Sequence, residues 1–216
     1  MRYLDMETWP RREHFKLFNA YDHPHFGITA NVDLTAFYPV VKQHGFSFTV
    51  VMVYVISRAS NAIAEFRYRI RAGEVVEHEI VHPSFPILVD EDVFSFCTID
   101  YVDDFPEFAA IAAKGIEDVK EHLTLEDEPG RDDLLFMTAI PWVSFTSFRA
   151  PMPLHPGDSI PRYAWGKFFQ DGDSLKMPLC VEVHHALVDG IHVGRFYEKV
   201  QSYLHNPGSL LGEASY

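Results

Sequence analysis

Apolar and polar residues alternate along several short segments of the chain, and a period of two predicts β-strands. Residues 70–74 and 75–80 form two such segments around Ala72-Gly73, which predicts a hairpin with a tight turn. The other predicted strands are 26–35, 85–89, 93–100, 162–170 and 175–184.

Longer segments carry apolar residues at helical spacing and fall between these strands. The segment 48–66 is apolar at most positions, so we expect a helix buried on much of its surface. The other predicted helices are 7–19, with Pro10 in its first turn, 36–42, 105–123, and a segment that starts at Gly190 and continues through Leu204. No apolar run approaches about 18 residues, so no membrane-spanning helix is expected and no membrane partner is predicted.

The chain has 216 residues, of which 47% are apolar. This length suits one substantial core, and no linker or repeat divides the chain, so we expect one domain over residues 1–216. The first fifteen residues contain no apolar region of the kind that signal peptides carry. Cys97 and Cys180 each lie in an apolar strand-like run, so buried free thiols and a reducing cytoplasm are the expectation.

The net charge is −13, from 18 basic and 31 acidic residues. Nucleic-acid binding needs clustered lysine and arginine for phosphate contacts, so this balance argues against it. The acidic residues are spread over several segments, which is typical of a solvated surface.

The segment 181–192, VEVHHALVDGIH, carries the chemistry that the pattern predicts most directly. An alternating strand ends in His184 and His185, and Asp189-Gly190 then starts the next helix. Adjacent residues on a strand point to opposite faces, so only one of the two histidines can face a cleft. An imidazole at a strand end is well placed for proton transfer, because its ordinary pKa lies near neutrality, at about 6.5.

This HHALVDG string resembles the HHxxxDG signature of the chloramphenicol acetyltransferase family, which dihydrolipoamide acyltransferase cores share. Two further segments widen the resemblance. Residues 9–15, WPRREHF, resemble the family's N-terminal W-x-R-R/K-E-H-F, and residues 137–148, MTAIPWVSFTSF, resemble its apolar-P-W-V-x-F-x-S-F segment. The three motifs stand in the family's order, and the resemblance runs from Trp9 to Val200.

The resemblance implies an α/β fold, a two-layer sandwich in which a mixed sheet packs against helices. It implies acetyl transfer from acetyl-CoA to a hydroxyl group in a ternary complex, without an acyl-enzyme. His185 would be the general base, and Ser147 would donate a hydrogen bond to the oxyanion. Asp189 would have a structural role, in a buried ion pair with Arg12, and a carbonyl near the histidine would hold the other ring nitrogen.

Within this resemblance, the sequence differs from the family at positions that face the acceptor in family members. A pocket phenylalanine is kept at Phe94, whereas Phe18 stands where the family has a tyrosine. Leu125-Glu126 replace another pocket phenylalanine, and Ala164 replaces a threonine. The sequence therefore does not identify the acceptor, and chloramphenicol is one candidate. It also does not determine whether the acidic loop 126–133 controls access to the site.

The family also implies a coenzyme tunnel and an assembly. Phe168 beside Lys167 is the candidate for the tunnel, although an aromatic at this spacing also suits the strand core. Family members are homotrimers with active sites between subunits, so the strand that ends in His185 would meet Phe94 or Ser147 of a neighbour.

Other functions use parts of the same residue set. A non-catalytic trimer could keep the pocket to sequester a small ligand, and a related acyltransferase could use a thiol acceptor. A hydrolase would need a nucleophilic serine elbow, and the sequence contains no G-x-S-x-G. A metal site would need converging ligands, and the histidines at 23, 25, 82, 184, 185 and 192 do not form an HExxH or similar pattern. We therefore expect a site without metal.

Overall fold

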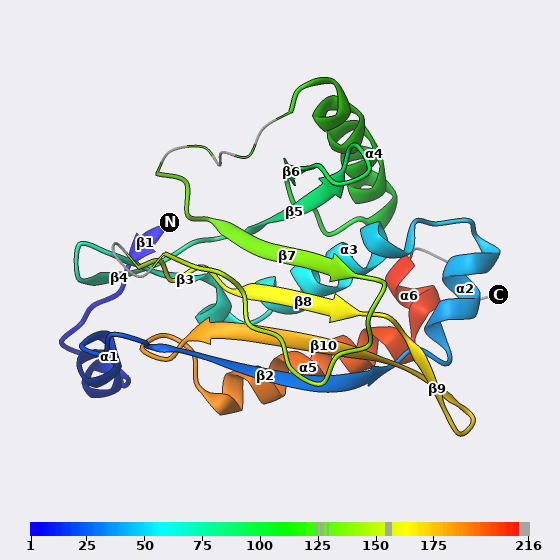
Figure 1. Ribbon diagram of the computed structural model, residues 1–216. Helices are drawn as coiled ribbons and strands as arrows, with labels where there is room; N and C mark the ends of the chain where they lie inside the picture. The colour runs from blue at the N-terminus through cyan, green and yellow to red at the C-terminus, as the bar shows by residue number, and fades with distance from the viewer. Residues whose placement is uncertain (124, 126–127, 129, 154–156, 212–216) are drawn as a thin grey trace.

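The computed structural model describes residues 1–123, 125, 128, 130–153 and 157–211, and Figure 1 shows how their elements are arranged. The strands are β1 (Arg2–Tyr3), β2 (His25–Asp33), β3 (Tyr68–Arg71), β4 (Glu74–Glu77), β5 (His82–Leu88), β6 (Phe94–Thr98), β7 (Leu134–Ile140), β8 (Arg162–Gly166), β9 (Phe169–Asp171) and β10 (Ser174–His184). The helices are α1 (Arg12–Asn19), α2 (Phe37–Gln43), α3 (Phe48–Asn61), the 3-10 helix η1 (Ala64–Arg67), α4 (Phe105–Glu121), α5 (Gly190–His205) and α6 (Pro207–Leu211).

A mixed sheet occupies the centre of the described chain. Its strands follow the order β2-β10-β8-β7-β5-β6, and β9 pairs with β10. The pairs β5–β7 and β7–β8 are parallel, whereas β10 is antiparallel to β2, β8 and β9. The pairing of β10 with β2 runs from Lys176 opposite Asp33 to His184 opposite His25, which fixes the point where the histidines leave the sheet.

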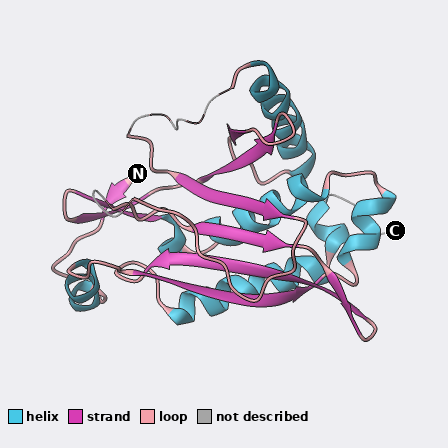
Figure 2. Cartoon of the chain, viewed as in Figure 1, coloured by secondary structure: helices cyan, strands magenta, loops and turns pink. Residues whose placement is uncertain are grey.

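The helices cover one face of this sheet (Figure 2). Helix α3 packs on α5, and α5 packs on β2. The loop between β7 and β8 crosses the opposite face, and α1 lies beside the end of β10 where the chain turns into α5 (Figure 1). A mixed sheet layered against helices is the fold that the family resemblance implied, and the prediction is confirmed.

Helix α3 forms the middle of the core, because ten of its fourteen residues are buried. Ser47 caps it, since the Ser47 hydroxyl accepts the Val50 N–H at 3.5 Å. The predicted helix over 48–66 was too long. Ile63 takes an extended backbone with φ −127°, which ends α3, and the chain continues as η1 before it enters β3.

The predicted hairpin is confirmed as β3 and β4. Ala72 and Gly73 both have positive φ, at 50° and 82°, which is the backbone that a two-residue turn between twisted strands requires. Together with β1 these strands make a separate three-stranded sheet in the order β1-β4-β3.

The predicted strand over 162–170 is interrupted after Gly166, between β8 and β9. The Lys167 N–H donates to the Val143 carbonyl at 2.9 Å, so this residue bonds the crossing loop instead of a strand. A Cβ on Gly166 would lie 2.7 Å from that same carbonyl oxygen, so glycine lets the loop approach the sheet.

The described residues include no helix with both the length and the apolar character that a membrane crossing requires.

Candidate active site

The HHALVDG segment forms a tight turn between β10 and α5. The His185 N–H donates to the Pro24 carbonyl at 2.8 Å, which ties the turn to the start of β2. The Leu187 and Val188 N–H groups both donate to the His184 carbonyl at 3.0 Å. Asp189 then caps α5 through its side chain, which accepts the Gly190 N–H at 2.6 Å. The segment therefore delivers His185 from a strand end with its backbone fixed on both sides.

The imidazole of His185 lies between two aromatic rings. Phe18 of α1 stacks on it with ring centroids 3.8 Å apart and planes 5° from parallel. Phe26 of β2 approaches at 4.6 Å with a tilt of 47°. Aromatic faces at these separations favour one ring orientation.

The ring nitrogen Nδ1 of His185 is buried and has no hydrogen-bond partner among the described residues. The expectation that a carbonyl holds this nitrogen is therefore not met in the described chain. The orientation of the ring depends instead on its packing between Phe18 and Phe26.

The predicted ion pair between Arg12 and Asp189 was wrong, and Arg11 takes that place. Arg11 Nη1 lies 3.3 Å from Asp189 Oδ2, and Arg11 Nη2 donates to the His185 carbonyl at 3.4 Å. The Arg12 guanidinium instead donates to the Glu7 carbonyl and lies 3.4 Å from Glu13. Helix α1 begins at Arg12, so the residue before it points back toward the turn while Arg12 points outward.

The Asp189 carboxyl is only partly buried, with a side chain 39% exposed, whereas the Arg11 side chain is 17% exposed. Burial acts to raise the pKa of Asp189, but the Gly190 N–H and the Arg11 guanidinium outweigh it, so this pKa is lowered. The carboxylate stays ionised and ties α1 to the turn, as the structural role predicted for Asp189 requires.

His184, the other histidine of the pair, points to the opposite side. It is 7% exposed, and its ring meets His25 edge to face at 4.9 Å. Burial, assisted by the neighbouring His25, lowers the pKa of His184 to about 4. Its Nδ1 accepts the Ala186 N–H at 3.3 Å, which only the neutral ring can do. His184 is thus a packed structural histidine.

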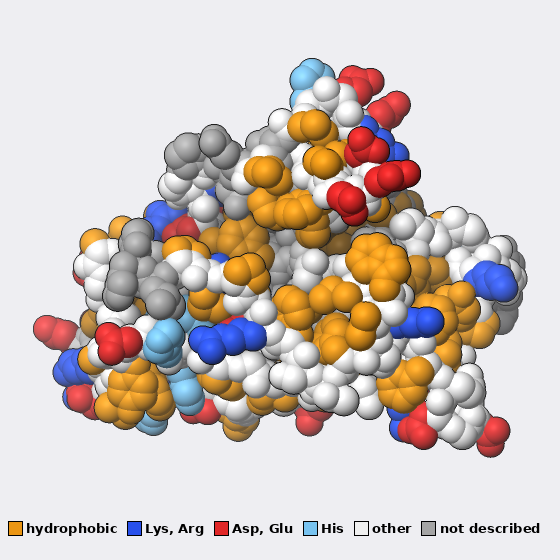
Figure 3. All heavy atoms as spheres, viewed as in Figure 1, with side chains coloured by type: hydrophobic (Ala, Val, Ile, Leu, Met, Phe, Trp, Pro, Cys, Tyr) orange, Lys and Arg blue, Asp and Glu red, His pale blue; other side chains and the backbone are white. Residues whose placement is uncertain are grey.

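An apolar cleft of about 890 Å³ lies beside the β7–β8 loop on the sheet face that this loop crosses, and its wall also includes residues at the start of α3 and in α4. Figure 3 shows hydrophobic side chains gathered on this face of the molecule. Phe94, which the sequence predicted as an acceptor contact, lines the cleft and is 46% exposed. The other aromatic residues of its wall are Phe96, Phe136, Trp142, Phe148 and Tyr163. The cleft has the size and lining that a small apolar molecule requires.

The predicted oxyanion donor and the predicted base lie on different parts of the chain. Ser147 is exposed, on the loop that follows β7 and next to Phe148 of the cleft wall. His185 and Phe18 do not line the cleft. Within the described residues, no hydrogen bond joins Ser147 to His185. One chain therefore holds His185 in one place and an apolar cleft in another.

The coenzyme candidates lie at the end of β8. Phe168 packs against the core, with its ring 4.9 Å from Tyr38 and 6.1 Å from Phe48. Lys167 is exposed beside it. This packing suits the core alternative for Phe168, and the coenzyme role of the pair stays a prediction.

Among the described residues, no group of three or more His, Cys, Asp or Glu side chains is arranged to hold a metal ion. Cys97 and Cys180 are buried free thiols, as predicted. Part of the acidic loop 126–133, including Glu126, lies outside the described residues.

Besides the stack of Phe18 on His185, three contacts of the site were not predicted from the sequence. They are the second aromatic face at Phe26, the choice of Arg11, and a buried contact of His192 with Glu65 behind the turn. Alternation along 26–35 predicts the strand that carries Phe26, but its pairing with the strand of the histidines is seen only in the structure.

Comparison with known proteins places these features in context. A family model described as Chloramphenicol acetyltransferase matches residues 1–201. The chloramphenicol acetyltransferase of Klebsiella sp is 33% identical over 201 residues, covering 93% of this chain and 92% of that protein. The enzyme of Proteus mirabilis is 34% identical over 201 residues, covering 93% of each.

Two solved structures extend the comparison. A chloramphenicol acetyltransferase superposes with a TM-score of 0.83 at 29% identity, covering 94% of this chain and 99% of that chain. The dihydrolipoamide acetyltransferase of Azotobacter vinelandii superposes with a TM-score of 0.65 at 18% identity, covering 92% and 88%, which indicates a shared fold.

Proposed function

This chain belongs to the chloramphenicol acetyltransferase family, and on that premise we propose that it acetylates a hydroxyl group of a small apolar molecule such as chloramphenicol. The chain is an enzyme of the acetyl-CoA-dependent acyltransferase class. The observation that carries the proposal is the fixed imidazole of His185, stacked at 3.8 Å on Phe18 at the end of β10.

In this mechanism His185 removes the proton from the acceptor hydroxyl, whose oxygen attacks the thioester carbonyl of acetyl-CoA directly. The tetrahedral oxyanion accepts a hydrogen bond from the Ser147 hydroxyl. Collapse of this intermediate breaks the carbon–sulfur bond, and the imidazolium returns the proton to the leaving thiolate. No acyl-enzyme forms, so both substrates must be bound together.

The acceptor would occupy the apolar cleft beside Phe94. Its wall is mostly hydrocarbon and aromatic, so the burial of an apolar molecule there would supply most of the binding free energy. Ser84, Ser47 and Thr138 contribute hydroxyl groups to the lining, which could orient the polar groups of the acceptor.

The separation of His185 from this cleft supports a site shared between subunits. A homotrimer would bring His185 of one chain against the cleft and Ser147 of its neighbour, in a head-to-tail ring that closes after three copies. Trp142 is 71% exposed at the cleft and would be covered by such a contact.

The direct test is the release of coenzyme A thiol from acetyl-CoA over a panel of acceptors. Chloramphenicol and other apolar alcohols should support turnover, and dihydrolipoamide would report a thiol acceptor. His185→Ala should abolish turnover, and Ser147→Ala should lower kcat by about a hundred-fold. A wild-type protein that binds these ligands tightly and turns none over would favour the sequestering alternative.

Subunit mixing tests the shared site. When His185→Ala and Ser147→Ala chains are refolded together, half of the chains supply an intact histidine and half an intact serine. About a quarter of the interfaces would then be fully intact and active. Sites contained within one chain would gain nothing on mixing. Light scattering should report three times the chain mass of 24.8 kDa.

A further inference from the structure

His192 lies directly beneath the turn that carries His185. It occupies the third position of α5 and is 6% exposed. Its Nδ1 accepts the backbone N–H of Asp189 at 2.9 Å. The Asp189 side chain in turn caps the first turn of the helix, so the two residues form a reciprocal capping box.

This contact fixes the protonation state of the His192 ring. An Nδ1 atom that accepts a hydrogen bond carries no proton, so the ring proton sits on Nε2. Nε2 lies 3.4 Å from Oε1 of Glu65, and the pair is arranged so that the carboxylate faces the protonated nitrogen. Glu65 belongs to η1, an element separate from the turn in sequence.

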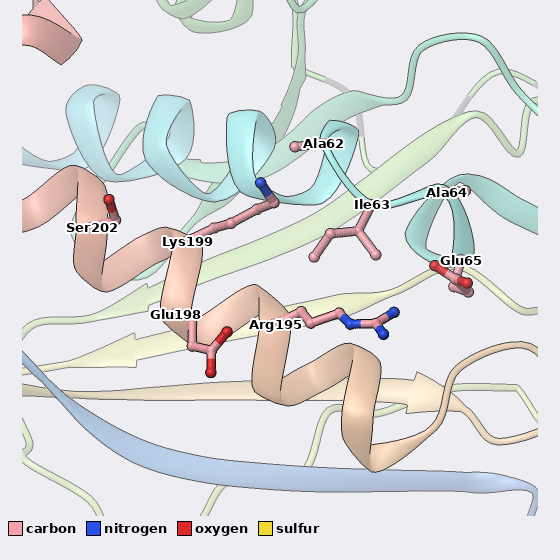
Figure 4. A pocket seen from close by; sticks show the side chains of 8 residues that line it. All are labelled: Ala62, Ile63, Ala64, Glu65, Arg195, Glu198, Lys199 and Ser202. Atoms are coloured by element: carbon pink, nitrogen blue, oxygen red, sulfur yellow. The ribbon is translucent and has the colours of Figure 1, made fainter.

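The charged groups around His192 come from three elements. Burial lowers the pKa of His192, and Arg11 and Arg195 act in the same direction, whereas Glu65 and Asp189 act to raise it. Glu65 and Arg195 also line an open cleft of about 400 Å³ between η1 and α5 on the helical side of the molecule. Figure 4 shows the Arg195 side chain extending from α5 across this cleft toward η1 and Glu65.

The turn between His185 and Gly190 is therefore held from two directions. On one side Arg11 reaches the His185 carbonyl at 3.4 Å and the Asp189 carboxylate at 3.3 Å. On the other side His192 holds the Asp189 N–H. Neither contact touches the imidazole of His185, but both fix the backbone from which it projects.

We propose that His192, oriented by Glu65, is a positioning residue that keeps the backbone of the catalytic turn, and hence His185, in its productive geometry. This inference rests on the proposed general-base role of His185. His192 lies on the helical side of the turn and does not line the apolar cleft, so its effect is on the turn alone.

Two substitutions of nearly equal shape isolate this effect. In His192→Asn the side-chain oxygen can take the place of Nδ1 and accept the Asp189 N–H. In His192→Leu the same space is filled without an acceptor. His78→Leu is the matched control, because His78 is also buried, at 7% exposed. Its Nε2 lies 2.9 Å from Oδ1 of Asp132, in a hydrogen bond that does not involve the turn.

His192→Leu should lower kcat by about ten- to a hundred-fold, because small displacements of a catalytic group are costly, while KM for both substrates stays within about two-fold. His192→Asn should recover kcat to within about three-fold of wild type. His78→Leu should lower the melting temperature while it leaves kcat unchanged well below that temperature.

Equal kcat values for the Asn and Leu variants, or a kcat for His192→Leu that matches His78→Leu, would overturn the inference. Should His192→Leu fail to fold, kcat and KM of the variant Glu65→Ala, which changes a side chain that is 21% exposed, decide the question. A lower kcat at unchanged KM supports the role, and an unchanged kcat contradicts it.

The outcome is separable from that of the proposed function. Wild-type protein that turns over no acceptor refutes the general-base role. The ¹⁵N signals of the His185 imidazole report its position without turnover. A shift of these signals in His192→Leu but not in His192→Asn supports positioning even then, and identical spectra for the two variants contradict it.

Discussion

The ring of Phe18 lies parallel to the imidazole of His185, with centroids 3.8 Å apart, although 167 positions separate the two residues in sequence. The Phe18 ring of α1 thereby contacts the proposed base, and Arg11, just before α1, contacts the His185 carbonyl. Because Nδ1 of His185 has no hydrogen-bond partner among the described residues, this stack is the main constraint on the ring plane.

Removal of the stack should therefore impair the chemical step. We expect Phe18→Leu to lower kcat by about ten-fold, because the ring can then turn away from its reactive orientation. Phe18→Tyr keeps the aromatic face and should retain kcat. Steady-state kinetics of thiol release would measure both, with Leu17→Ala, an exposed neighbour on α1, as the control. Equal kcat for the leucine and tyrosine variants would contradict the stacking role.

Arg11 and Arg12 offer a matched pair, because they are adjacent and only one contacts the turn. Arg11→Leu removes the guanidinium that contacts the Asp189 carboxylate and the His185 carbonyl. We expect a fall in melting temperature of about 2–4 °C, equivalent to roughly 1 kcal/mol, together with a lower kcat.

Arg12→Leu should change stability by less than about 0.5 kcal/mol, because its ion pair with Glu13 joins two exposed side chains. Thermal unfolding and kinetics on the two variants would check this contrast. A larger loss from Arg12→Leu than from Arg11→Leu would restore the pairing that the sequence first predicted.

Much of this site could be predicted from sequence because its parts are local. The alternation through Val183 and the Asp189-Gly190 step determine where β10 ends and α5 begins, and the observed boundaries agree with them. The buried helix α3 and the hairpin at Ala72-Gly73 follow from the same kind of local pattern.

The errors come from facts that are not local. Which of two adjacent arginines faces the turn depends on whether α1 begins before or after Arg11, and helix ends are the least certain feature of a pattern. The break at Gly166 depends on a loop that crosses from Val143. The stack of Phe18 on His185 needs the tertiary fold, because nothing in either segment encodes the other.

The apolar cleft yields a prediction about specificity. Phe94→Ala removes an aromatic side chain that lines the cleft, so we expect KM for an apolar acceptor to rise by about ten-fold with little change in kcat. Val93→Ala is the control, because Val93 is similarly exposed, at 49%, but does not line the cleft. A KM for acetyl-CoA that rises instead would assign Phe94 to the coenzyme.

His184 predicts how stability depends on pH. Burial disfavours the charged ring and is the main reason why the pKa of His184 is lowered from its ordinary value of 6.5 to about 4 in the folded chain. Between these pH values the unfolded chain binds a proton that the folded chain does not, so the free energy of unfolding decreases as the pH is lowered. The contribution is complete above pH 6.5 and lost as pH falls toward 4, and it amounts to about 3 kcal/mol.

His184→Phe removes this titration while it keeps an aromatic ring against His25. We therefore expect the loss of unfolding free energy between pH 7 and pH 4 to be smaller in the variant than in the wild type, measured by urea unfolding at one fixed protein concentration. His25 and His192 also have lowered pKa values from burial, so a pH dependence should remain in the variant. His122→Gln, at an exposed position, should lose as much stability as wild type. If His184→Phe also loses as much as wild type, His184 is not the neutral, buried group that its contact with the Ala186 N–H requires.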